Sequence, residues 1–364
     1  MSFSEADVQG ALKNLIDPNT KKDFVSGKAV KNVKISGNDI SLDIALGYPA
    51  KSVWGEIGAL VEGHLKTALP GSGKISANVT SQVVPHSVQT GAKLVEGVKN
   101  IIAVASGKGG VGKSTTAVNI ALALAAEGAR VGMLDADIYG PSQPTMLGIT
   151  GQPETDGSHY MEPMTNHGLQ AMSIGFLIAN DDTPMIWRGP MVVQALDQLL
   201  RQTRWDNLDY LVVDLPPGTG DIQLSLAQQV PVTGAVIVTT PQDIALMDAR
   251  KGLKMFEKVG IKIVGIVENM STHICSKCGH EEHIFGSGGG EKMCTDYGTE
   301  LLGSLPLDIH IREQTDSGKP SVVADPDGNV AKSYKQIARR IGVKIAEMSK
   351  GHSTVFPKIV VENN

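Results

Sequence analysis

The segment IIAVASGKGGVGKSTT, residues 101–116, carries the strongest structural signal in this chain. Its first five residues, 101–105, are small apolar or β-branched and predict a short buried strand. A glycine-rich loop follows, in which successive backbone N–H groups can turn inward around an anion. The loop then supplies the charge of Lys113 for phosphates and the hydroxyl of Ser114 for Mg²⁺. Residues 115–128 predict a helix whose positive dipole end faces the same anion.

The loop fits the pattern G-x-x-x-x-G-K-[ST], which arises by chance in roughly a few per cent of chains of this size. Its glycines are Gly107, Gly109, Gly110 and Gly112. Because a strand is predicted directly before the loop and a helix directly after it, a chance match is remote. The stretch therefore predicts a phosphate-binding loop. Lys108 is a second lysine that a phosphate cradle does not need, and a solvated loop charge is its simplest interpretation.

Carboxylates end two further predicted strands. Asp135 and Asp137 follow the apolar segment 130–134, and Asp214 follows the segment 211–213. Ligands of α/β sheets bind at the carboxyl ends of the strands, so we expect these side chains beside the phosphate-binding loop. At such a position Asp214 is expected to hold Mg²⁺ through water. Turn formation is the alternative role for each aspartate.

Alternating apolar segments and helical patterns predict a mostly parallel, helix-flanked sheet. Further strands are expected at 169–174, 234–240, 261–269 and 301–306, and helices at 191–202, 244–259 and 330–348. The predicted fold class is therefore α/β, with the architecture of a P-loop NTPase.

A small α+β domain is predicted at residues 1–85. Its elements follow the order α-β-β-α-β, at 5–16, 30–36, 40–46, 51–68 and 74–84. We expect a linker at 86–98, the ATPase domain at 99–350 and a C-terminal tail at 351–364.

The composition is ordinary for a globular protein. Hydrophobic residues make up 41% and charged residues 20% of the 364 residues, and the formal net charge is −5. This charge argues against a nucleic-acid partner held by bulk electrostatics. No apolar run reaches membrane-spanning length, and the N-terminus lacks the features of a leader peptide. Since the three cysteines make no disulfide framework, we expect a cytoplasmic protein without a membrane partner.

The segment HICSKCGHEEH contains Cys275 and Cys278, whose spacing lets two thiolates converge on one metal centre. A structural zinc needs four ligands, and His280, His283 or Cys294 could complete the set, although their spacing is unlike that of a zinc finger. A redox dithiol is the second interpretation, but it would want its first cysteine at the start of a helix that follows a strand.

An iron-sulfur cluster is the third interpretation of the cysteine pair. A [4Fe-4S] cluster usually takes four thiolates, and this motif offers two per chain. Two chains related by a twofold axis offer four, so this interpretation predicts a homodimer with the cluster on its axis. A cluster shared near the surface is expected to be labile, which suits a protein that passes it on.

The C-terminal two-thirds of the chain resembles the Mrp-type iron-sulfur cluster carriers, which belong to the MinD and ParA-like ATPases with a deviant P-loop. The matching segments lie within residues 99–325 and are GKGGVGKST, LDADIYGPS, VVDLPPGTGD, VTTPQDIAL, ENMS followed by CSKCGH, and IFGSGGGE. Residues 1–85 are weakly similar to the iron-sulfur assembly domain often fused ahead of such ATPases. Freestanding members commonly carry a cysteine after the second strand, where this chain reads GYPAKS, so we expect this domain to serve docking or regulation.

Several residue roles are implied by the resemblance alone. Lys108 would reach across a dimer interface to the nucleotide of the partner. Asp137 would orient the attacking water, and Asp135 would support Mg²⁺ through water. Cys275 and Cys278 would be the bridging cluster ligands, whereas Cys294 matches no ligand of the family.

The loop and the resemblance together give a nucleotide-binding set. Its members are Gly107, Lys108, Gly109, Gly110, Val111, Gly112, Lys113, Ser114, Thr115 and Asn269. Asn269 would hydrogen-bond the adenine edge, with turn capping as its alternative role. The expected magnesium ligands are Ser114 and Asp214.

The function implied is that of a slow ATPase that binds an iron-sulfur cluster and transfers it to apo-proteins. Its expected cofactors are ATP, Mg²⁺ and a [4Fe-4S] cluster, and its expected partners are a second copy, cluster donors and apo-protein clients. One rival is a positioning or partition ATPase with zinc at the cysteine pair, but the C-terminal STVFPKIVVENN is not the basic amphipathic helix that membrane binding needs. The other rival is a reductase like the nitrogenase iron protein, whose cluster ligands are far apart in sequence.

Overall fold

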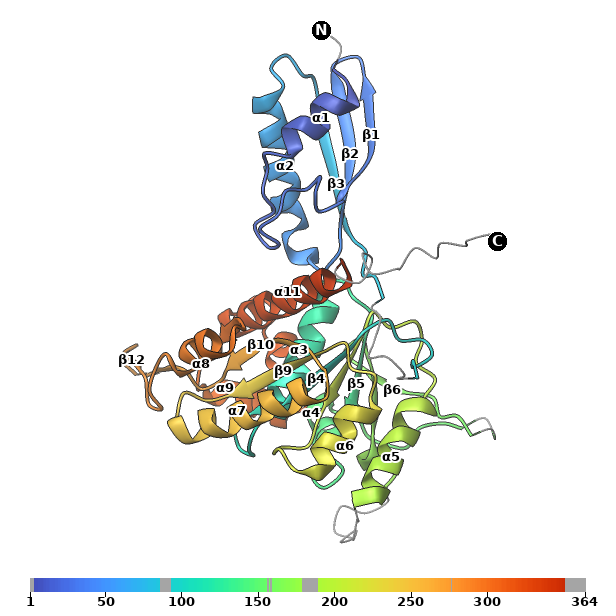
Figure 1. Ribbon diagram of the computed structural model, residues 1–364, viewed down its shortest axis with the longest axis vertical. Helices are drawn as coiled ribbons and strands as arrows, with labels where there is room; N and C mark the ends of the chain where they lie inside the picture. Colours follow the sequence, from blue (N-terminus) through green and yellow to red (C-terminus); the bar gives the residue numbers. More distant parts are fainter. Residues whose placement is uncertain are drawn as a thin grey trace, which may run out of the picture.

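The structure is a computed structural model that describes residues 3–85, 93–155, 157, 159–178, 189–275 and 277–350. Residues 86–92 of the expected linker and the expected tail 351–364 lie outside the described residues. Figure 1 shows a small N-terminal unit next to a larger α/β unit, with helix α11 (Asn329–Lys350) on the side of the larger unit that meets the small one. Each unit has its own hydrophobic core.

The N-terminal unit is a three-stranded sheet, in the order β1-β2-β3, packed with two helices. Strand β2 pairs antiparallel with β1 and parallel with β3. The elements are α1 (Glu5–Leu12), β1 (Val30–Ser36), β2 (Asp39–Leu46), η1 (Lys51–Val53), α2 (Trp54–Ala68) and β3 (Ile75–Ser81). The predicted order of helices and strands is thus confirmed. Helix α1 ends short of the expected residue 16, because the amides of Asn14 and Leu15 donate to carbonyls three residues back.

The larger unit is built on an eight-stranded sheet whose strands are parallel except for β6 at one edge. In sheet order the strands are β13 (Leu301–Ser304), β10 (Ile263–Glu268), β9 (Gly234–Thr239), β4 (Ile101–Ala105), β8 (Tyr210–Asp214), β5 (Val131–Asp135), β7 (Leu169–Ser173) and β6 (Met164–Asn166). The central strands are buried on both faces, which explains their continuous apolar sequences. The predicted α/β class is confirmed.

Helices cover both faces of this sheet (Figure 1). One layer contains α3 (Lys113–Ala126), α4 (Gln143–Leu147), α9 (Ile309–Asp316), α10 (Ser321–Ala324) and α11. The other contains α5 (Gly189–Arg201), α6 (Asp221–Gln229), α7 (Asp243–Lys258) and α8 (Gly289–Tyr297). A short turn of 3-10 helix, η2 (Ile174–Phe176), follows β7. None of the described helices has the length and apolarity needed to cross a bilayer.

Some elements are not apparent from the sequence. Helix α8 begins with two glycines, which have poor helix propensity, but Gly289 fits because a Cβ there would overlap the Leu246 side chain of α7. A two-stranded hairpin, β11 (His273–Ile274) with β12 (Glu281–Glu282), surrounds the cysteine pair. Its strands are too short to produce an alternating pattern.

Candidate functional site

The phosphate-binding loop joins the carboxyl end of β4 to the first residue of α3. Gly110 and Gly112 have left-handed φ values of 82° and 79°, which only glycine adopts without strain. A Cβ on Gly112 would overlap the amide of Asn269, and that amide donates a hydrogen bond of 2.9 Å to the carbonyl of Val111. Asn269 therefore supports the backbone of the loop from the end of β10. Its predicted contact with adenine stays a prediction.

The start of the loop is equally constrained. A Cβ on Gly107 would overlap the backbone of Asp248, so helix α7 lies directly against this turn. Ser106 donates from its hydroxyl to the carbonyl of Lys108 at 2.8 Å, and its own carbonyl accepts the amide of Gly218 at 3.0 Å. The proline- and glycine-rich loop after β8 is thereby joined to the phosphate-binding loop. A displacement of one loop would therefore shift the other through this hydrogen bond.

Lys113 and Asp214 form a buried ion pair inside the site. The ammonium of Lys113 donates to Asp214 Oδ1 and also to the hydroxyl of Ser114 at 3.0 Å. The lysine is 6% exposed and the aspartate 0%. The two expected magnesium ligands thus share one cation in this structure. The Ser114 hydroxyl and the Asp214 carboxylate are oxygen ligands that suit a small cation. In this structure the ammonium of Lys113 supplies the positive charge between them.

Gln143, at the start of α4, completes this cluster. Its Nε2 donates to Asp214 Oδ2 at 2.9 Å and to the carbonyl of Ser114 at 3.3 Å. Its Oε1 is buried, and so is the hydroxyl of Ser142, and neither has a hydrogen-bond partner among the described residues. Unpaired buried oxygens beside Ser114 and Asp214 match the oxygen-rich, partly hydrated environment that Mg²⁺ prefers. The residues present therefore fit a magnesium-nucleotide complex.

Asp135 lies beside Asp214 in register on the neighbouring strands β5 and β8. Burial and the adjacent charge of Asp214 raise the pKa of Asp135 to about 7. Backbone amides of Ser142 and Gln143 donate to its Oδ2 at 3.0 Å, and the hydroxyl of Ser173 donates at 3.1 Å. Its carboxylate thereby positions the chain that carries Gln143.

Asp137 is half-buried, two residues beyond β5. Burial raises the pKa of its carboxyl, the charge of Lys113 opposes that rise, and the charge of Asp214 adds to it. Asp137 is therefore close enough to both members of the ion pair to respond to their charge. Among the carboxylates discussed, it is the one that stays partly open to water.

Three residues of this site have no motif that would identify them in the sequence. Gln143, Ser173 and Ser106 act through contacts with residues distant in the chain or through the backbone of a loop. The one available signal was the position of Gln143 shortly after Asp135 and Asp137. Sequence alone does not say which way its amide points.

The cysteine pair occupies the turn between β11 and β12. The amide of Cys275 donates to the carbonyl of His280 at 2.9 Å, and the amide of Gly279 donates back to the carbonyl of Cys275 at 2.8 Å. Gly279 has a φ of 71°, which closes the turn tightly. Cys278 is exposed and Cys275 half-exposed. Both sulfurs are therefore available to a ligand at the surface.

The electrostatics of the turn favour a thiolate. Hydrogen bonds from the backbone amides of Lys277 and Cys278 lower the pKa of Cys275. A thiolate is the form that binds metal, so the turn prepares its first cysteine for a ligand role.

The other candidate ligands of a zinc site do not gather with the pair. His280 is 68% exposed, and its Nε2 lies 3.8 Å from Glu282 Oε1. His283 uses its Nδ1 in a 2.9 Å hydrogen bond with the carbonyl of Ser271, and Cys294 is buried in α8. Burial, with the charges of nearby glutamates, raises the pKa of Cys294 to about 11. Across the described residues, no three His, Cys, Asp or Glu side chains gather to hold a metal ion.

Comparison with known proteins decides the family. The family described as NUBPL iron-transfer P-loop NTPase matches residues 97–342, and the family described as iron-sulfur cluster assembly protein matches residues 5–79. The chain belongs to the NUBPL-type iron-transfer P-loop NTPases. The resemblance found in the sequence is thus confirmed for both parts of the chain.

Relatives within the NUBPL-type family match over most of the chain. The iron-sulfur cluster carrier protein of Escherichia coli is 50% identical over 342 residues, covering 93% of this chain and 92% of the relative. The iron-sulfur cluster transfer protein NUBPL of Mus musculus is 53% identical over 251 residues, covering 68% of this chain and 78% of the relative.

Solved structures share the fold of the larger unit. A nucleotide-binding protein of Archaeoglobus fulgidus, solved in complex with ADP, is 34% identical with a TM-score of 0.57, covering 65% of this chain and 92% of that one. The cell division ATPase MinD of Pyrococcus furiosus is 23% identical, with a TM-score of 0.50. The match covers 66% of this chain and 98% of the MinD chain. The MinD likeness shows the shared fold alone.

Proposed function

We propose that this protein is an ATP-hydrolysing carrier that holds a [4Fe-4S] cluster between two copies of the chain and delivers it to apo-proteins. The observation that carries the proposal is the surface turn with two accessible sulfurs, Cys275 and Cys278, and no further ligand of the same chain beside them among the described residues. The names of the E. coli and mouse relatives, a cluster carrier and a cluster transfer protein, support it. The cluster is cargo, so an exposed and incomplete ligand set suits its exchange.

The surroundings of the pair support a contact with a second copy. Ile274 and Ile284 flank the turn and are 58% and 51% exposed. Large apolar side chains next to a metal-binding turn are costly in water, and covering them with a partner is favourable. A twofold axis through the turn would supply the two missing thiolates and bury both isoleucines together.

The nucleotide site would work through the residues of the loop. On binding, Lys113 would exchange Asp214 for the outer phosphates, and the loop amides would surround them. Ser114 and Asp214 would hold Mg²⁺, which when bound neutralises phosphate charge during hydrolysis. Asp137 would orient the attacking water. Asp135 would support Mg²⁺ through water and would also keep Gln143 in place. Lys108 would reach the nucleotide of the second copy.

The path from nucleotide to cluster would be short. Asn269 contacts the loop at Val111, and the cysteine turn begins only four residues later, at His273. Between them Met270 has a left-handed φ of 57°, which is unusual for a long side chain. A change in the loop would therefore reach the turn through one strained residue. Residues 1–85 would act as a docking or regulatory domain, and slow hydrolysis and a cytoplasmic location stay part of this proposal.

The decisive experiment is anaerobic reconstitution with iron and sulfide. Broad visible absorption is expected for the native chain and for Cys294→Ala, because Cys294 is buried away from the turn. The same absorption is expected to disappear in the Cys275→Ala, Cys278→Ala double variant. If the purified protein were instead a monomer with zinc and no iron at the cysteine pair, it would be a P-loop ATPase without a cluster.

The nucleotide roles are tested by two variants. Lys113→Ala is expected to abolish phosphate binding, whereas Asp137→Ala is expected to keep nucleotide affinity and slow hydrolysis. The measurements are equilibrium binding of a fluorescent ATP analogue and phosphate release. Equal loss of affinity in both variants would contradict the roles assigned here.

A further inference from the structure

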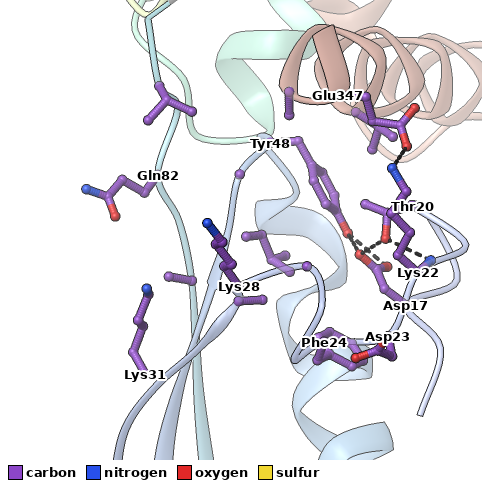
Figure 2. Close-up of a pocket in the computed structure, with 18 residues that line it drawn as sticks. Asp17, Thr20, Lys22, Asp23, Phe24, Lys28, Lys31, Tyr48, Gln82 and Glu347 are labelled. Atoms are coloured by element: carbon purple, nitrogen blue, oxygen red, sulfur yellow. Dashed lines mark hydrogen bonds and ion pairs between the residues drawn. The ribbon is translucent and has the colours of Figure 1, made fainter. Parts of the chain in front are cut away.

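A cavity of about 270 Å³ lies between the N-terminal unit and helix α11. Figure 2 shows its lining, with Tyr48 at the centre, Lys28, Lys31 and Gln82 on one side and Glu347 near Lys22 on the other. Much of its wall is apolar and includes Phe24, Ala29, Ala45, Leu46, Val343 and Ala346. None of these residues belongs to the nucleotide site or to the cysteine turn.

The polar groups inside the cavity are satisfied by the wall itself. Tyr48 is 2% exposed and donates from its hydroxyl to Asp17 at 2.9 Å. Asn19 donates to the Tyr48 hydroxyl at 3.1 Å, and Thr20 donates to Asp17 at 3.0 Å. The part of the cavity around Tyr48 therefore offers carbon rather than free hydrogen-bonding groups, and an apolar group is its favourable occupant.

One side of the cavity is closed by an ion pair between the two units. Lys22 Nζ lies 2.7 Å from Glu347 Oε1 of α11. Val343, one turn earlier on α11, is 6% exposed and packs into the core of the N-terminal unit. The cavity is thus a built feature of the contact between the units.

The other side carries two lysines. Lys28 and Lys31 are exposed, and no ion pair joins either ammonium to a carboxylate within the described parts of the chain. Lys28 has a left-handed φ of 59° in a turn closed by its amide on the carbonyl of Val25 at 2.9 Å. This turn fixes the backbone of Lys28 at the edge of the cavity.

We propose that this cavity is a docking site for an acidic peptide segment of a partner protein, which inserts an apolar side chain between Tyr48 and α11 and sets carboxylates against Lys28 and Lys31. The cavity lies just below the 300–1,000 Å³ usual for pockets that enclose a small molecule, so it fits one or two side chains of a chain that continues outside. Lys31 also lies on β1, an edge strand that can accompany an extended peptide. The proposal rests on the carrier function, since a carrier must meet the proteins that it serves.

The test uses full-length protein without cluster or nucleotide, so that its failure leaves the proposed carrier function untouched. Fluorescein-labelled hexapeptides with leucine and phenylalanine at the centre, flanked by glutamates, by lysines or by serines, are titrated by fluorescence polarisation. The acidic peptide is expected to bind best, and more weakly as salt is raised.

Charge reversal distinguishes the site from general electrostatics. The double variant Lys28→Glu, Lys31→Glu is expected to bind the acidic peptide with roughly tenfold lower affinity, because two attractive charges become repulsive. The matched control, Lys13→Glu with Lys74→Glu, changes net charge equally at exposed positions that lie outside the cavity and off strand β1, and it is expected to leave binding unchanged. Ala346→Phe, which fills the cavity from α11, is expected to abolish binding while nucleotide affinity is retained.

Several outcomes would overturn the proposal. They are no preference for the acidic peptide in the native chain, equal loss in the control pair, or full binding in Ala346→Phe. Displacement of a fluorescent fatty acid by decanoate, without any peptide binding, would assign the cavity to a small amphiphile instead. Thermal melts of each variant confirm that the fold is retained.

Discussion

At the scale of single residues, the central feature is the ion pair of Lys113 and Asp214. An isolated carboxylate in this buried position would be costly, and the lysine removes that cost while no nucleotide is bound. The same lysine is the group expected to meet phosphate. In the nucleotide-free site, Lys113 therefore serves as the counterion of Asp214.

We predict that Lys113→Ala lowers the free energy of unfolding of the nucleotide-free protein by about 3 kcal/mol, because Asp214 is left buried and unpaired. Adding Asp214→Asn is expected to restore most of the loss, since the amide needs no counterion. Guanidinium denaturation of the single and double variants measures both values. Additive losses would show that the pair is not coupled in the native state.

The thiols provide a second prediction, which depends on pH. The pKa of Cys294 is raised to about 11, so at pH 8 only about a thousandth of it is thiolate. The pKa of Cys275 is lowered, so it is expected to react first. With iodoacetamide at pH 8, mass mapping should find Cys275 and Cys278 alkylated and Cys294 intact. Its protection is expected to fade only as the pH approaches 11; early modification of Cys294 would contradict its buried position.

At this scale the sequence predicts the residues of the motifs better than the residues that hold them in place. Gly112, Lys113 and Asp214 follow from spacing, because a phosphate loop and a strand end impose residue type locally. Gln143 does not, because its amide acts across the sheet on another strand. Its role needs the register of β5 beside β8, which a single sequence does not contain.

At the scale of elements, strand β10 and its continuation join the two chemical sites. Asn269 supports the nucleotide loop, Met270 turns the chain through a left-handed conformation, and Ser271 accepts from the ring of His283 behind the cysteine turn. Residues 269–271 therefore run from a contact with the nucleotide loop to a contact behind the cysteine turn.

We predict that Met270→Gly weakens the dependence of cluster release on nucleotide several-fold. Glycine removes strain of about 1 kcal/mol but gives up side-chain packing and gains freedom in the unfolded chain. Stability should therefore change little, while the constraint between the loop and the turn is lost. Release to a chelator with and without ATP measures this, and Met270→Leu, which keeps the strain, is the control. Unchanged nucleotide dependence in Met270→Gly would show that coupling runs elsewhere.

Strands were predictable where they are buried on both faces, as with β4, whose sequence is continuously apolar. Helix α8 and the β11–β12 hairpin were not, because their local sequences are glycine-rich or too short. Their positions are fixed by tertiary contacts, such as Gly289 against Leu246 and the amide of Gly290 on Glu268 at 2.6 Å. Periodicity cannot report such contacts.

At the scale of the whole molecule, the cysteine turn, the nucleotide loop and the proposed docking cavity lie in separate parts of the chain. The cysteine turn projects from the sheet beyond β10, and the N-terminal unit meets α11 on another side of the larger unit (Figure 1). This separation would let a second copy cover the turn while a client engages the N-terminal unit. The oligomeric state of the protein with its cluster bound therefore tests whether two copies share the cluster.

We predict that the loaded protein is a dimer with about two iron and two sulfide ions per chain, because one four-iron cluster takes its four thiolates from two chains. Native mass spectrometry under anaerobic conditions should show twice the chain mass plus one cluster, and should lose the cluster after chelation. The Cys275→Ala, Cys278→Ala variant should bind no iron, while Cys294→Ala should match the native protein. Because Cys275 and Cys278 are the only cysteines at this surface turn, four irons on a monomer would require ligands other than the thiolates assigned here, and the bridged cluster would have to be abandoned.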